Sequence, residues 1–157
     1  STHINSKMAT TYAALTIENN GYEFNNIGDS KGYLCRNGKL LKMTKDHNTV
    51  QVLLDEGLLT EEEAKNHPQR HVIYQALGMQ EEDTEPEPYI SEKQMAQDGD
   101  ILLLCTDGVT DMITEREIEG ILGNKIIQNK AEVIIEKAIE NGGKDNATAL
   151  VVEVKDD

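Results

Sequence analysis

The chain has 157 residues, of which 38% are hydrophobic and 28% are charged, a balance typical of one soluble globular domain with its own core. Its 29 Asp and Glu residues outnumber 15 Lys and Arg residues, which gives a net charge of −14. This excess of acid disfavours nucleic acid and anionic membrane surfaces as partners, because both need a basic face, but it suits divalent cations and basic protein segments.

The first part of the chain has the pattern of antiparallel strands. Asn19-Asn20-Gly21 and Asn37-Gly38 are strong turn signals, because Asn and Gly tolerate the positive φ of tight hairpins. Short apolar, aromatic and β-branched runs between these signals predict a meander of four strands, near residues 10–18, 22–28, 31–36 and 39–43.

Helical spacing follows. Val50, Leu53, Leu54 and Leu58 fall on one helical face, and Thr60 with Glu63 forms a capping box at the start of a second short helix that ends near His67-Pro68. An acidic loop at 81–87 and an extended segment come next.

The last part of the chain begins with a continuous apolar run, Ile101 to Cys105, which predicts a strand covered on both faces. Further elements are expected as a helix capped by Thr114, a helix over 129–140 that stops at Gly142-Gly143, and a strand over 147–154. Strands, then helices, then strands predict an α+β fold with mainly antiparallel pairing, in a single domain over residues 1–157.

The setting is expected to be cytoplasmic and reducing. The chain has no signal peptide and no apolar stretch of membrane-spanning length. Cys35 and Cys105 each lie in an apolar run, where a cysteine acts as a small buried hydrophobic residue.

Three acidic residues, Asp29, Asp107 and Asp145, stand at expected strand ends, flanked by Gly or small polar residues. Adjacent strands would bring such carboxylates together, where they would repel unless a cation neutralised them. All-oxygen ligands of this kind select Mg²⁺ or Mn²⁺. Turn chemistry is the alternative reading, because Asp and Gly also form ordinary turns.

Two chemistries based on a covalent nucleophile fit this region poorly. In an aspartyl-nucleophile phosphatase the nucleophile would stand where this chain has Cys105, and a cysteine-based enzyme would need a phosphate-binding loop ending in Arg, which CTDGVTDM lacks. Capping or surface roles are expected for His3, His47, His67 and His71, with a catalytic or metal-binding role as the alternative.

The chain resembles the bacterial form of the metal-dependent, type-2C protein serine/threonine phosphatases. The matching stretches are MATTYAAL, NNIGDSKGYLCRNGKLLKMTKDHNTV and its continuation to QALG, DGDILLLCTDGVTDMITEREI, and GGKDNATALVVEV. The resemblance implies a sandwich of two antiparallel β-sheets flanked by helices, and hydrolysis of phosphoserine and phosphothreonine on proteins in bacterial signalling. It also implies a binuclear Mg²⁺ or Mn²⁺ centre and no covalent enzyme intermediate.

The resemblance assigns roles to particular residues. Asp107 and Asp145 correspond to ligands of the first catalytic metal, and Asp29 with Asp107 to the site of a third metal. Residues 46–78 correspond to a flap beside the active site, and Asp46-His47 belongs to a family pattern that we expect to be structural. Asp111, Gly108 and Asn146 are expected around the outer shell of the ion, although Asp111 would equally suit a helix N-terminus.

The chain also departs from the family pattern. An early Glu-Asp pair, a metal-bridging Asp-Gly and a phosphate-binding Arg have no counterpart here, so we expect the C-terminal two-thirds of a domain with little activity on its own. Missing strands would expose sheet edges that allow a homodimer or complementation by another segment. The alternative is a phosphatase-like binding or regulatory module without catalysis.

Overall fold

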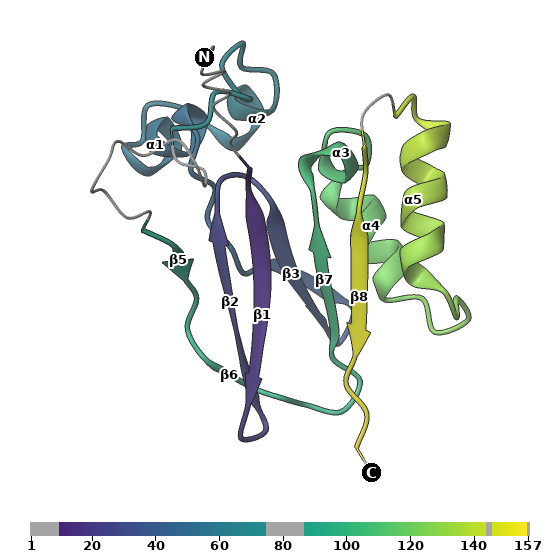
Figure 1. The fold of residues 1–157 in the computed structure, drawn as a ribbon. Helices are drawn as coiled ribbons and strands as arrows, with labels where there is room; N and C mark the ends of the chain where they lie inside the picture. Colours follow the sequence, from purple (N-terminus) through teal and green to yellow (C-terminus); the bar gives the residue numbers. More distant parts are fainter. Residues whose placement is uncertain (1–9, 75–86, 144–145, 157) are drawn as a thin grey trace, which may run out of the picture.

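Two four-stranded antiparallel sheets pack face to face (Figure 1). The computed structural model describes residues 10–74, 87–143 and 146–156. The first sheet contains β1 (Tyr12–Glu18), β2 (Gly21–Ile27), β5 (Tyr89–Ile90) and β6 (Gln94–Met95), with β1 and the short β5 and β6 all paired to β2. The second sheet has the order β4-β3-β7-β8, formed by Lys39–Lys42, Lys31–Arg36, Ile101–Cys105 and Ala149–Glu153.

Both predicted hairpins are present. Asn19 and Asn20 have φ values of 48° and 62° between β1 and β2, and Asn37 and Gly38 have φ values of 53° and 76° between β3 and β4. Two consecutive residues with positive φ give the turn whose twist matches that of the flanking strands. The predicted strand bounds differ from the observed ones by two residues at most.

Five helices lie within the described residues: α1 (Thr49–Asp55), α2 (Glu61–Lys65), α3 (Asp107–Thr110), α4 (Glu115–Leu122) and α5 (Lys130–Glu140). Both predicted capping boxes form, at Thr60 and at Thr114. The chain does not make a plain turn after β7: it enters α3 at Asp107. No helix among the described residues is long and apolar enough to cross a membrane.

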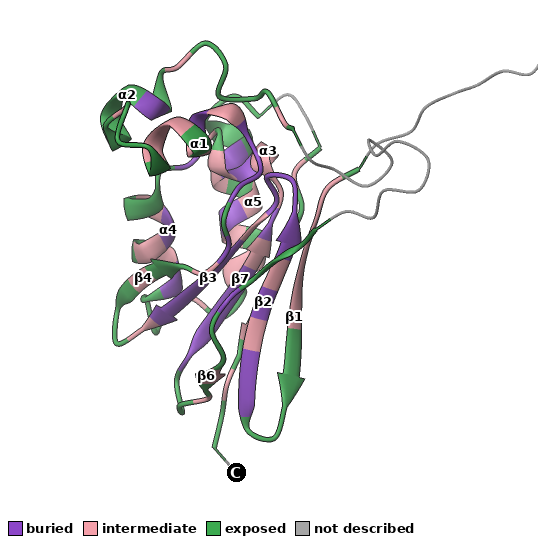
Figure 2. Cartoon of the chain, turned by 90° about the vertical axis from the view of Figure 1, so that its left-hand side faces the viewer, coloured by how far each residue is buried: buried purple, intermediate pink, exposed green. Residues whose placement is uncertain are grey.

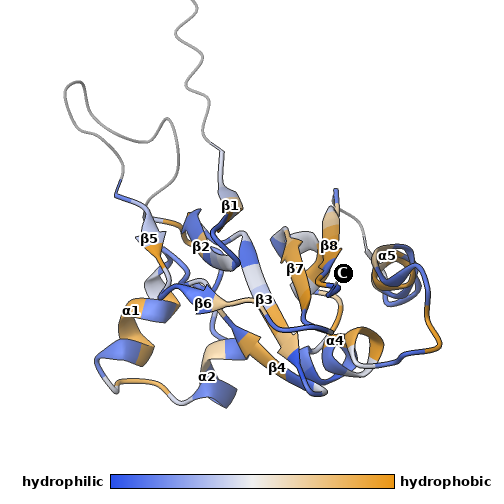
Figure 3. Cartoon of the chain, turned by 90° about the horizontal axis from the view of Figure 1, so that it is seen from below, coloured by the Kyte–Doolittle hydropathy of each residue, from blue (hydrophilic) through white to orange (hydrophobic). Residues whose placement is uncertain are grey.

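Apolar residues form two clusters, one on either side of the second sheet. Figure 2 shows buried residues along β2, β3 and β7, and Figure 3 shows hydrophobic residues along β7 and β8. Leu102 packs with Tyr22, Phe24 and Leu34 between the sheets. Leu103, the next residue, belongs to the larger cluster beneath α3, α4 and α5. This arrangement confirms the prediction that the Ile101–Cys105 strand is covered on both faces, and both cysteines are buried and free.

A buried polar network closes the end of the sandwich away from α3. Asp100 is 1% exposed and receives hydrogen bonds from Arg36 at 2.8 and 2.9 Å, from the Tyr22 hydroxyl at 3.0 Å and from the Gln97 amide at 3.0 Å. The network joins β2, β3 and the start of β7, and thus connects the two sheets.

Each sheet ends in an open strand on the same side of the sandwich, β1 in the first and β8 in the second (Figures 1 and 3). Ile17 shares the inward face of β1 with its partner Tyr22, yet it is 65% exposed. Leu150 shares the inward face of β8 with its partner Leu104, yet it is 55% exposed. Among the described residues, these two inward-facing apolar side chains therefore lack a covering strand.

Candidate metal centre

The pairing of β3 with β7 brings two of the predicted carboxylates to one end of the sandwich. Lys31 lies opposite Cys105 in the antiparallel register. Asp29 precedes Lys31 and Asp107 follows Cys105, so both extend beyond the same end of this strand pair. β8 begins at this end as well, with Ala149 opposite Cys105.

Asp29 lies deep in this end of the molecule, with only 4% of the residue exposed. Burial raises the pKa of its carboxyl group from the usual 3.8 to about 6, and the negative charge of Asp107 adds to the rise. The positive charge of Lys31 partly offsets this rise in pKa. Lys31 Nζ also donates a hydrogen bond to the Asp29 carbonyl oxygen at 2.8 Å. A carboxylate in this position would be stabilised by a cation that approaches Asp29 and Asp107 together.

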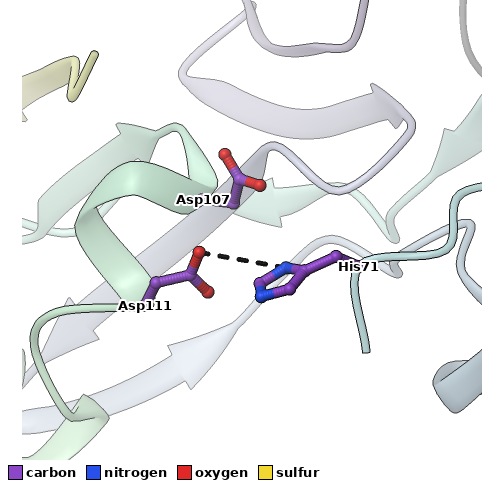
Figure 4. A group of neighbouring side chains, drawn as sticks. All are labelled: His71, Asp107 and Asp111. Atoms are coloured by element: carbon purple, nitrogen blue, oxygen red, sulfur yellow. Dashed lines mark ion pairs between the residues drawn. The ribbon is translucent and has the colours of Figure 1, made fainter. Parts of the chain in front are cut away.

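Asp107 opens α3, and its side chain faces those of Asp111 and His71 (Figure 4). One possible ligand atom from each of these three residues lies within 4.8 Å of the others, and His71 Nδ1 is 3.9 Å from Asp111 Oδ2. Burial raises the pKa of Asp111. The charge of His71 partly offsets this rise, and the charge of Asp107 adds to it. Asp111 is the C-cap residue of α3 and stands three residues before Thr114, the N-cap of α4, so a role near the N-terminus of α4 stays a prediction.

His71 is the member of this group for which the sequence favoured a capping or surface role over metal binding. It is exposed, as expected, but it borders two carboxylates that are distant in the chain. The other histidines of the helical region differ from it. His67 Nδ1 accepts a hydrogen bond from the Gln69 amide at 3.1 Å, a contact within the turn after α2, whereas His47 is buried.

Gly108 allows the chain that enters β8 to lie against the start of α3. A Cβ atom at Gly108 would be 2.5 Å from the Asn146 carbonyl oxygen. The neighbouring residues hold the same contact, since the Thr106 amide donates to the Thr148 carbonyl at 3.2 Å and the Thr148 amide donates to Thr106 Oγ1 at 3.1 Å. The predicted ligand Asp145 lies outside the described residues.

These groups open onto a cleft of about 900 Å³. Residues of the helical segment 46–74 form one wall, and α3 with its flanking residues forms the other. The lining combines the carboxylates of Asp29, Asp107 and Asp111 with the cationic side chains of Lys65 and Arg70. Carboxylates favour a hard divalent cation, and the cations beside them favour an anionic ligand.

Cys105 cannot serve as a nucleophile in this arrangement. It is 4% exposed, and burial raises the pKa of its thiol to about 12, so the reactive thiolate does not form near neutral pH. The chemistry of this end of the molecule therefore depends on its oxygen ligands.

Comparison with known proteins identifies the family. The family described as protein phosphatase 2C matches residues 63–147, which include Asp107, Gly108 and Asn146. The chain belongs to the protein phosphatase 2C family. One relative, the serine/threonine phosphatase stp of Listeria welshimeri, is 41% identical over 150 residues, covering 93% of this chain and 57% of stp.

Solved structures of the protein phosphatase 2C type share the fold. The serine/threonine phosphatase PstP/Ppp of Mycobacterium tuberculosis superimposes with a TM-score of 0.80 at 39% identity, covering 92% of this chain and 59% of PstP. The catalytic domain of PstP in complex with two manganese ions gives a TM-score of 0.78 at 38% identity, covering 94% of this chain and 60% of that domain. These likenesses confirm the predicted sandwich of two antiparallel sheets with helices, and the chain spans less than two-thirds of each relative.

Proposed function

We propose that this chain carries part of the active site of a metal-dependent phosphatase that hydrolyses phosphoserine and phosphothreonine on proteins. The supporting observation is the convergence of Asp29 and Asp107 at the cleft, where their mutual repulsion and burial favour a bound cation. The donor set fits Mg²⁺ or Mn²⁺, since it consists of carboxylate oxygens with one imidazole at the rim.

In this proposal Asp107 and Asp145 hold a catalytic cation, and Asp29 with Asp107 holds a further one. Asp111, Gly108 and Asn146 lie around this set, with Gly108 admitting the Asn146 backbone to it. Divalent cations bound in such a site supply Lewis-acid stabilisation of a phosphoryl group and activation of water. The chain's own carboxylates fix where those cations stand relative to the cleft.

We propose that the flap-like segment 46–78, whose described part forms one wall of the cleft, controls the access of a phosphoprotein substrate. Both cysteines are free and buried, which is consistent with action in the reducing cytoplasm. The retained carboxylates favour a phosphatase over a non-catalytic module, because repelling carboxylates at a cleft would only lower stability without a cation.

Because the chain spans 57% of stp, we propose that full activity belongs to a longer domain and that this chain alone is weakly active. The open strands β1 and β8, with Ile17 and Leu150 exposed beside them, suit strand addition by a second copy or by another segment. Sedimentation tests whether these open strands pair: a homodimer is expected if the strands of two copies pair with each other in solution.

A Mn²⁺ titration by calorimetry tests the site, with hydrolysis of an aryl phosphate followed in parallel. Asp107→Asn should abolish most of the binding, whereas Asp156→Asn, an equal charge change beside Asp98 at the other end of β7, should leave it unchanged. Binding that is insensitive to Asp107 would overturn the proposed site. Tight binding with full turnover would support the site and refute the proposal that the chain alone is weakly active.

A further inference from the structure

The segment that follows β4 lies along the turn that carries Asp29, and residues on both sides contact one another. The contacts are a hydrogen bond from the Gly32 amide to Thr44 Oγ1 at 2.9 Å, one from Asn26 Nδ2 to the Lys45 carbonyl at 2.8 Å, and an ion pair between Lys31 Nζ and Asp46 at 3.2 Å. The turn is therefore held from outside its own strands.

His47 bonds the residue that precedes Asp29. The Gly28 amide donates to His47 Nδ1 at 3.0 Å, and the His47 amide donates to the Gly28 carbonyl at 2.9 Å. Gly28 has a φ of +92° and lies directly against the Thr11 side chain, so this position beside Asp29 requires glycine. The backbone N–H and C=O of Gly28 are thus both bonded to His47, which is 9% exposed.

The same residue also closes the base of the helical segment. The Tyr74 amide donates to the His47 carbonyl at 3.1 Å, and the two rings meet edge to face with centroids 5.7 Å apart. The next residues continue the contact through the bridge between Asn48 and Ile73 and a 3.0 Å hydrogen bond from the Thr49 amide to Val72. Residues 47–49 and 72–74, the neck of the segment, therefore meet at His47.

We propose that His47 is a positioning residue that sets the placement of the Asp29 carboxylate and couples cation binding there to the neck of the helical segment. This inference rests on the proposed role of Asp29 as a cation ligand. A neutral imidazole with Nδ1 as acceptor fixes the peptide next to Asp29, while the backbone and ring of the same residue fix the neck. A cation that orders Asp29 would then also order residues 47–49 and 72–74.

A double-mutant cycle on the full chain separates this role from general loosening of the fold. His47→Ala should weaken Mn²⁺ binding about tenfold by calorimetry, the effect typical of removing a residue that orients a metal ligand. His47→Asn, whose Oδ1 can accept from the Gly28 amide, should restore most of the affinity. In an Asp29→Asn background, His47→Ala should have no further effect. His67→Ala is the matched control, since its Nδ1 contact stays within the helical segment.

Each outcome bears on one part of the argument. If Asp29→Asn binds Mn²⁺ like the unmodified chain, the proposed cation site fails. If Asp29→Asn binds more weakly but His47→Ala does not, only the positioning role fails. Equal losses from His47→Ala in both backgrounds would show a general structural effect and would also overturn the role.

Amide exchange provides a test that needs no variant at His47. Mn²⁺ should slow the exchange of the Thr49 and Tyr74 amides in the unmodified chain and should leave them unchanged in Asp29→Asn. Exchange at these two amides that is insensitive to Mn²⁺ in the unmodified chain, under conditions where calorimetry shows Asp29-dependent binding, would overturn the coupling.

Discussion

Replacing Asp29 by Asn should stabilise the metal-free protein near neutral pH. The carboxyl group of Asp29 has its pKa raised from 3.8 to about 6, first by burial and then by the charge of Asp107. Near pH 7.5 the folded protein must therefore hold a charge that the unfolded chain carries more easily. Asn has nearly the same shape and no charge, so it removes this cost.

The magnitude and the pH range follow from linkage between protonation and folding. Because the folded-state pKa lies above the unfolded one, the stability linked to the Asp29 proton is fully present below about pH 3.8 and is lost as the pH rises to about 6. A difference of about 2 pH units corresponds to roughly 3 kcal/mol at about 1.4 kcal/mol per unit, and solvent in the open cleft lowers the expected gain to about 1–2 kcal/mol.

Urea denaturation of both proteins in chelator, at intervals from pH 4 to pH 8, measures this gain. The free energies of unfolding of the two proteins should be equal near pH 4, and their difference should grow up to about pH 6. Saturating Mn²⁺ should reverse the order, since only the unmodified chain keeps the full ligand set and gains stability by binding. Equal or lower stability of Asp29→Asn at pH 7.5 in chelator would refute the reasoning, and Asp156→Asn should show no pH-dependent difference.

Three further predictions concern single positions. Gly108→Ala should destabilise the protein by about 1–3 kcal/mol in urea, because its Cβ would be 2.5 Å from a backbone carbonyl, whereas Gly120→Ala, in open space within α4, should stabilise it by about 0.5–1 kcal/mol. Asp100→Ala should cost about 3–5 kcal/mol by leaving Arg36 without its buried partner, with Mn²⁺ affinity unchanged. Asp107→Asn should lower the pKa of Asp29, measured by carbon NMR in chelator, since it removes the second cause of the rise.

The sequence predicted those features that depend on neighbouring residues. The two Asn-containing turns, the capping boxes at Thr60 and Thr114, and the apolar run before Asp107 each carry a local physical signal, and all are present in the structure. Antiparallel pairing followed from the hairpins. The grouping of Asp29 with Asp107 could be expected because both stand at strand ends, and the register of β3 with β7 brings them to the same end.

Other features depend on contacts between distant segments, and no local pattern encodes them. His71 lies beside Asp107 and Asp111 because the helical segment lines the cleft opposite α3, and His47 is buried where it bonds both Gly28 and Tyr74. Strands β5 and β6 have two residues each, too few for an alternating pattern, and their pairing with β2 fixes them instead. Sequence reasoning could name these histidines but could not distinguish their roles.

Two buried aspartates at opposite ends of the sandwich show why only one end is a candidate for chemistry. Burial alone would raise the pKa of Asp100, but hydrogen bonds from Arg36, the Gln97 amide and Tyr22 hold it below its usual value. Asp29 is buried almost as deeply, and its pKa rises because burial, reinforced by the charge of Asp107, outweighs the partial compensation by Lys31. The charge of Asp100 is therefore neutralised by the fold itself, whereas the charge of Asp29 is left for a cation to neutralise.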